Sequence, residues 1–151
     1  MTDDASAVVY RVQAAEKTYV TFEVEVKNPG GHSSRPRLDN AIYELADALK
    51  AVQALRFPVM HTPMTLNYLQ QTGQLTGGNT GKALMTFANN PQDKAAADTL
   101  FSMPEYVGTT RTTCVATMLG GGHAENALPQ SAKATVNCRV FPGSEGQEVK
   151  A

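Results

Sequence analysis

The sequence has no tryptophan, only two cysteines and almost no net charge, with 13 Lys and Arg against 14 Asp and Glu. Such a balance gives no broad field that would draw the chain to nucleic acid or to an anionic membrane. No apolar run approaches the roughly 18 residues that cross a bilayer. The opening MTDDASAVVY also lacks the basic start and apolar core of a signal peptide. We therefore expect a soluble protein with no nucleic-acid or membrane partner.

At 151 residues the chain is long enough for one domain and too short for two ordinary ones. Its two cysteines, Cys114 and Cys138, lack the CxxC spacing of metal or redox sites. Because unpaired cysteines are usually interior, the sequence predicts two small buried thiols. These cysteines leave the compartment unknown, either cytoplasmic or periplasmic.

Alternating segments and one amphipathic helix define the predicted frame. Residues 18–26, TYVTFEVEV, alternate with the period of a half-buried strand. After the turn NPGG, the apolar residues from Asp39 to Leu55 recur at steps of three and four, which indicates an amphipathic helix. Two further strands are predicted over residues 112–119 and 132–140. Ser144 is then a candidate N-cap for a helix that begins near the end of the chain.

Residues 57–111 contain the turn-rich stretches QTGQLTGGNTG and FANNPQDK, and DKAAADTLFSM suggests one short helix. We interpret this segment as an insertion with local structure, because its many apolar side chains need an interior.

The order strand, helix, insertion, strand, strand and start of helix predicts an α+β fold of the ferredoxin-like split β-α-β type. This is a two-layer sandwich, with an antiparallel sheet that carries helices on one face and an insertion after the first helix. We assign residues 1–151 to a single domain: 15–56 hold the first strand and helix, 57–111 the insertion, and 112–151 the strand pair and the start of a second, truncated helix. The β-forming residues from Val8 to Val12 suggest an additional strand.

Sequence motifs point away from several kinds of chemistry. The histidines show no zinc-ligand spacing, so no metal site is predicted in this chain, and there is no GxSxG nucleophile motif. A polar set remains near the ends of predicted strands: His32, Asn126 and Arg139. An arginine fork and an amide suit a carboxylate, so strand geometry could gather these residues into an anion-binding site. The same residues are also compatible with a turn histidine, a loop cap and a surface arginine.

Two stretches, VEVKNPGGHSSRP and GGGHAENALPQSAKATVNCRVFPG, resemble the dimerisation, or lid, domain of a zinc-dependent metallopeptidase family. That family contains carboxypeptidase S, glutamate carboxypeptidase, aminoacylases and succinyl-diaminopimelate desuccinylase, and the wording NALPQ and VNCRVFPG is most similar to the carboxypeptidase S branch. The resemblance extends from around Ala15 to the end of the chain.

The resemblance implies a homodimer formed through this domain, in a parent enzyme whose separate catalytic domain binds two zinc ions. It implies that His32 helps to polarise the scissile carbonyl in the partner's active site, a transition-state role. It also implies that Asn126 and Arg139 hold the free carboxylate of a peptide or N-acyl amino acid substrate, whose amide bond the parent hydrolyses.

The zinc ligands and the general base of that catalytic domain are absent from these 151 residues. We therefore expect no cofactor in this chain and no hydrolysis by the chain alone. The alternative is a free-standing ferredoxin-like module that binds an amino acid or regulates a partner.

Overall fold

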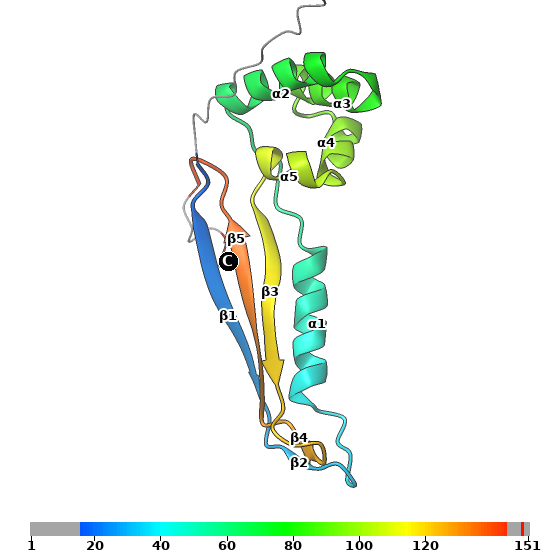
Figure 1. Ribbon diagram of the computed structural model, residues 1–151, viewed down its shortest axis with the longest axis vertical. Helices are drawn as coiled ribbons and strands as arrows, with labels where there is room; N and C mark the ends of the chain where they lie inside the picture. The colour runs from blue at the N-terminus through cyan, green and yellow to red at the C-terminus, as the bar shows by residue number, and fades with distance from the viewer. Residues whose placement is uncertain (1–15, 145–148, 150–151) are drawn as a thin grey trace, which may run out of the picture.

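The computed structural model describes residues 16–144 and 149, and its architecture is α+β (Figure 1). Three long strands, β1 (Tyr19–Lys27), β3 (Thr113–Gly121) and β5 (Ser131–Arg139), form an antiparallel sheet in the order β1-β5-β3. Helix α1 (Ala41–Ala54) lies along one face of this sheet. The fold class predicted from the sequence is confirmed. The helix predicted to follow Ser144 and the strand suggested around Val8 lie outside the described residues.

The core between α1 and the sheet follows from the periodicities of the sequence. Along β5 every second residue is buried, and the buried alanines Ala132 and Ala134 lie against Ala41 and Leu45 of α1. Small residues on both sides let the helix approach the sheet closely. The helix begins after Asn40, whose side-chain oxygen accepts a hydrogen bond from the Ile42 backbone N–H at 2.9 Å.

The opposite face of the sheet carries polar side chains. Lys133 of β5 pairs with Glu23 at 3.0 Å and with Glu25 at 3.5 Å, both on β1. Arg139 lies on this open face at the end of β5, directly across from Tyr19 at the start of β1. The open face is therefore hydrophilic along β1 and β5, whereas β3 adds the exposed Val115 and Met118, which pair with Asn137 and Thr135. The cationic end of this face is where β1 begins and β5 ends.

Cys114 of β3 and Cys138 of β5 form a disulfide, with their Cα atoms 4.0 Å apart. The prediction of two free thiols is therefore wrong, because both sulfur atoms take part in the disulfide. The two residues are direct cross-strand partners in the register of β3 against β5. Periodicity along each strand predicts which side chains face the core, but it does not predict which residues lie opposite each other.

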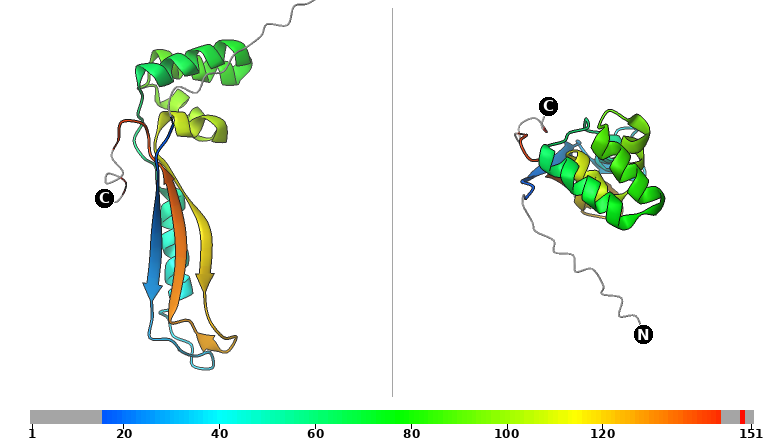
Figure 2. Two further views of the ribbon diagram at one scale, coloured as in Figure 1. Left: turned by 60° about the vertical axis from the view of Figure 1, so that its left-hand side comes forward. Right: turned by 90° about the horizontal axis from the view of Figure 1, so that it is seen from above.

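The insertion forms four helices at one end of the sheet: α2 (Pro63–Thr76), α3 (Gly78–Asn89), α4 (Lys94–Phe101) and α5 (Pro104–Thr110). They have an interior of their own, centred on Leu69, Leu84, Phe87 and Leu100. Figure 2, seen from above, shows these helices gathered over the end of the sheet. No helix among the residues described is long and apolar enough to cross a membrane.

Helices α2 and α3 correct the turn-rich interpretation of QTGQLTGGNTG. Gly73 and Gly81 lie inside the helices where these cross, and a Cβ on Gly73 would lie 2.8 Å from the Gly81 carbonyl oxygen. Glycine is needed there for close approach of the two backbones. Only Gly77 lies between the two helices; it and Gly78, the first residue of α3, have positive φ angles of 64° and 59° that favour glycine.

Candidate functional site

A short two-stranded ladder brings His32 and Asn126 together at the end of the molecule remote from the insertion (Figure 1). Strand β2 (Gly31–His32) pairs with β4 (Ala127–Leu128), with His32 opposite Ala127. The Ser33 backbone N–H donates to the Asn126 carbonyl at 3.0 Å. Both side chains are exposed, so this end presents an imidazole and an amide to the surroundings.

The loop around His32 also orients its ring. The Ser34 backbone N–H donates to the imidazole Nδ1 at 3.2 Å, and the Ser34 hydroxyl lies 2.8 Å from the same nitrogen. When Nδ1 accepts a hydrogen bond, the proton of a neutral imidazole is on Nε2. His32 therefore presents an N–H donor at Nε2, which suits a carbonyl oxygen.

An ion pair fixes the loop that leads from His32 to α1. The Arg37 guanidinium donates to the Asp39 carboxylate at 2.8 and 2.6 Å, and the Asn28 side chain donates to the same carboxylate at 3.2 Å. The hydrogen bonds from Arg37 are the main reason that the pKa of Asp39 is lowered to about 2. The Asp39 carboxylate therefore stays ionised at neutral pH, so its ion pair with Arg37 is retained there.

Arg139 lies at the opposite end of the sheet. Its guanidinium lies 5.2 Å from the centre of the exposed Tyr19 ring, a cation–π contact that restrains the fork. Among the residues that the structure describes, no carboxylate lies within the 4.0 Å of an ion pair with Arg139. The exposed fork is thus open to a carboxylate from outside the described chain.

The length of β5 separates the two groups. Ser131 follows the His32 end and Arg139 closes the strand, so the eight intervening steps span about 27 Å. One chain on its own therefore does not gather His32, Asn126 and Arg139 into a single site. The structure brings the first two together and leaves the third at the far end.

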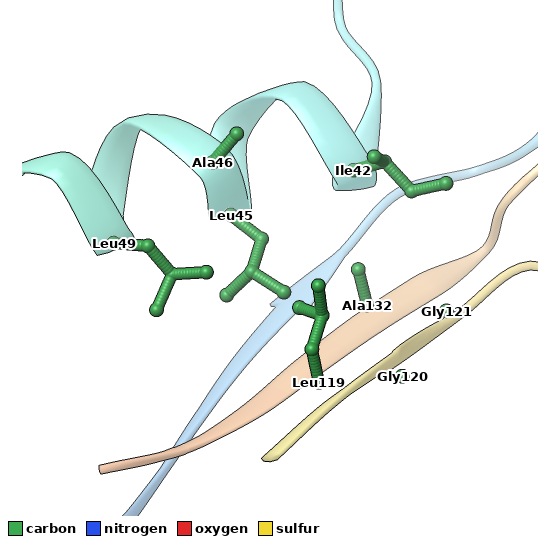
Figure 3. A pocket seen from close by; sticks show the side chains of 8 residues that line it. All are labelled: Ile42, Leu45, Ala46, Leu49, Leu119, Gly120, Gly121 and Ala132. Atoms are coloured by element: carbon green, nitrogen blue, oxygen red, sulfur yellow. The ribbon is translucent and has the colours of Figure 1, made fainter. Parts of the chain in front are cut away.

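An apolar groove runs between α1 and β3, which is one of the two outer strands of the sheet (Figure 3). Its volume is about 180 Å³, and Leu119 of β3 points into it toward Leu45 and Leu49 of the helix. Leu119 is 71% exposed, and Ile42 on the rim of the groove is 44% exposed. The lining residues are Ile42, Leu45, Ala46, Leu49, Leu119, Gly120, Gly121 and Ala132.

The two outer strands of the sheet differ in character. Strand β3 exposes Val115, Met118 and Leu119, whereas β1 carries Glu23 and Glu25. Charged side chains discourage the addition of another strand at an edge, and an apolar edge favours it. Of the two strands, β3 is the better surface for pairing with another chain.

A lysine that sequence analysis did not identify lies near Arg139. The Lys17 ammonium donates to the Arg111 carbonyl at 3.0 Å, and burial, followed by the nearby Arg139, lowers its pKa to about 8. No sequence motif marks this lysine. Only the pairing of Tyr19 with Arg139, which brings the start of β1 to the end of β5, reveals it.

The side chains that could hold a metal ion in this chain are those of His, Cys, Asp and Glu. Within residues 16–144 and 149, no three His, Cys, Asp or Glu side chains lie together in a way that could hold a metal ion. The described donor set therefore does not fit zinc.

Comparison with known proteins shows which family the chain belongs to. The model of the family described as "Peptidase dimerisation domain" matches residues 14–151. The protein named "Probable carboxypeptidase S-like 2" of Dictyostelium discoideum is 26% identical over 146 residues, which cover 95% of this chain and 27% of that protein. The "N-fatty-acyl-amino acid synthase/hydrolase" of Danio rerio is 28% identical over 142 residues, which cover 91% of this chain and 27% of that protein. The chain thus spans about a quarter of the length of these relatives, and it belongs to the peptidase dimerisation domain family.

Proposed function

We propose that this chain is the dimerisation and substrate-binding domain of a zinc-dependent hydrolase, which cleaves the amide bond of peptides or N-acyl amino acids. The observation that carries this proposal is the separation of His32 and Asn126 from Arg139 by the length of β5, beside an apolar outer strand. The names of the two relatives, a carboxypeptidase S-like protein and a fatty-acyl-amino acid hydrolase, support the substrate class.

The dimer would form through β3 and α1. If two copies pair their β3 edges about a twofold axis normal to the sheet, the strands run antiparallel and the two α1 helices lie side by side. The two helices would then cover the groove around Leu119. Leu119, which faces the helix side of the sheet, would be removed from water in this arrangement, and its burial would contribute to the driving force.

The same twofold axis would bring together residues that lie far apart within one chain. Antiparallel pairing turns the second copy end for end, so the partner's His32 and Asn126 come to the end of the joined sheet where this chain carries Arg139. Each dimer would then contain two composite sites, each built from one Arg139 and the opposite end of the other copy. This arrangement makes dimer formation a requirement for substrate binding.

Each residue has a chemical role in such a site. The Arg139 fork would bind the substrate's free carboxylate through two parallel hydrogen bonds, and Asn126 would add an uncharged donor. The Nε2–H of His32 would donate to the oxygen of the scissile carbonyl, where negative charge develops in the transition state. Zinc, held by residues outside this chain, would supply the activated water.

Mixing two inactive variants of the full-length parent tests the composite site. His32→Ala damages one contribution and Arg139→Met the other, so each homodimer should be inactive. After random exchange about half of the dimers are mixed, and each mixed dimer has one whole site of two, so activity should return to about a quarter of the wild-type value.

The mixture distinguishes the composite site from a site within one chain. If both residues served a site within their own chain, every site in the mixture would lack one of them and activity would stay absent. Light scattering on this chain across a dilution series supplies the companion measurement. A monomer at every concentration would contradict the proposed edge.

A further inference from the structure

The end of the sheet that carries Arg139 holds a second cation, Lys17, just before β1. Its ammonium donates to the Arg111 carbonyl at the end of α5 and lies 6.0 Å from the centre of the Phe141 ring. A Cβ on Gly108 of α5 would lie 3.3 Å from the same nitrogen. Lys17 therefore lies against the last helix of the insertion.

Lys17 and Arg139 have no described counter-charge. Within the described ranges, no carboxylate lies within 4.0 Å of either cation. Two neighbouring cations repel each other, and the partial burial of Lys17 adds a desolvation cost. An anion bound between them would relieve both effects. The charged or titratable side chains nearest to Lys17 along the chain and on the adjoining ends of β1, β5 and α5 are Glu16, Tyr19, Arg139, Glu105, Tyr106 and Arg111.

The surface next to Lys17 has room for a ligand group. A hollow of about 310 Å³ opens along Glu16, Lys17, Thr18 and Tyr19. Tyr19 borders this hollow, and the Arg139 guanidinium lies 5.2 Å from the centre of the Tyr19 ring. The hollow is therefore bordered by Lys17 and by the tyrosine whose ring contacts Arg139.

We propose that Lys17 is a second substrate-binding residue, which binds the free carboxylate of the substrate together with Arg139 and is held in position by helix α5. This inference rests on the proposed function, in which Arg139 binds that carboxylate. A carboxylate has enough lone pairs to accept two hydrogen bonds from an arginine fork and another from an ammonium.

Lys17 would add two properties that Arg139 lacks. A guanidinium stays charged at any ordinary pH, whereas Lys17 loses its proton near pH 8 when no anion is bound. Carboxylate binding should therefore weaken as the pH rises through that value. Because Lys17 contacts the Arg111 carbonyl, the insertion 57–111 would also take part in setting the site for the carboxylate.

An NMR titration of this chain tests the proposal. N-acetylglycine supplies a free carboxylate, and N-acetylglycinamide is a neutral control of nearly the same size. We expect N-acetylglycine to raise the pKa of Lys17 from about 8 toward its ordinary value of 10.5 and to shift the Arg139 Nε–H resonance. The amide should do neither.

Two variants complete the experiment. Lys17→Met keeps an apolar stem and removes the charge, and it should weaken N-acetylglycine binding about fivefold at neutral pH and abolish the pH dependence. Lys133→Met is the matched control, because Lys133 lies on the same open face but is paired with Glu23 and Glu25. Its binding of N-acetylglycine should not change.

The outcomes separate this inference from the proposed function. If Arg139 responds to N-acetylglycine and Lys17→Met binds it as tightly as the wild type, Lys17 has no part in the site, although the role of Arg139 stands. If neither cation responds, the carboxylate site of the proposed function fails as well. An equal response of Lys17 to the amide would also overturn the inference.

Discussion

Leu119 of β3 gives the proposed dimer a quantitative test. Leu119→Ala removes about three methylene-sized groups, each worth about 0.8 kcal/mol when buried. Because the side chain is 71% exposed in the single chain, its burial by a partner would account for about 1.7 kcal/mol per copy. A twofold interface contains the residue twice, so the variant should lose about 3.4 kcal/mol of association free energy. The dimer dissociation constant should then rise by between two and three orders of magnitude.

The assay is light scattering or sedimentation across a dilution series, and Leu75→Ala is the matched control. Leu75 is also a leucine, 67% exposed, but it lies on α2 of the insertion, away from β3. Equal dissociation constants for the wild type and Leu119→Ala would refute the reasoning. A loss in Leu75→Ala as large as in Leu119→Ala would place the interface elsewhere. At concentrations low enough that the chain is monomeric, thermal unfolding should be nearly unchanged in both variants, because both side chains are mostly exposed in the single chain.

The disulfide, the glycine crossing and the partly buried lysine each give a further measurable result. Replacing both Cys114 and Cys138 by alanine removes a disulfide that joins residues 24 positions apart. Urea unfolding should then show that the free energy of unfolding falls by about 3.5 kcal/mol, because the unfolded chain gains entropy. Gly81→Ala should cost about 1–3 kcal/mol, because the added Cβ meets a backbone carbonyl, whereas Gly120→Ala, with open space around it, should change stability little. The lowered pKa of Lys17 means that the unfolded chain binds more protons between about pH 8 and its ordinary 10.5, so stability should rise over that range and a flat profile would contradict this. Lys17→Met should remove the rise.

The sheet and its covering helix were predictable because burial on one face leaves a period along the chain. Residues of β5 alternate between the core and the open face, and those of α1 recur at helical spacing toward the sheet. Each of these signals comes from one segment alone. The fold class then followed from the order of the segments, since an alternating strand, a helix and two more strands have few compact arrangements.

Features that depend on two distant segments were not predictable in this way. The ladder that brings His32 to Asn126 has only two residues in each strand, too few for a periodic signal. The disulfide depends on the register of β3 against β5, and a slip of one residue would part Cys114 from Cys138. Glycine usually interrupts helices, so the glycines at the close crossing of α2 and α3 indicate turns when only the sequence is considered.

If His32, Asn126 and Arg139 act as proposed, their separation by β5 constrains how the chain can vary in length. Removing two residues from β5 and its neighbours would keep the alternation of core and open face, and the fold would survive. The same change would bring Arg139 about 7 Å closer to the opposite end of its own sheet, and in a dimer it would displace the partner's His32 as well. Insertions and deletions should therefore be tolerated in the helices over the end of the sheet and in exposed turns, and should abolish function in the strands well before they abolish folding.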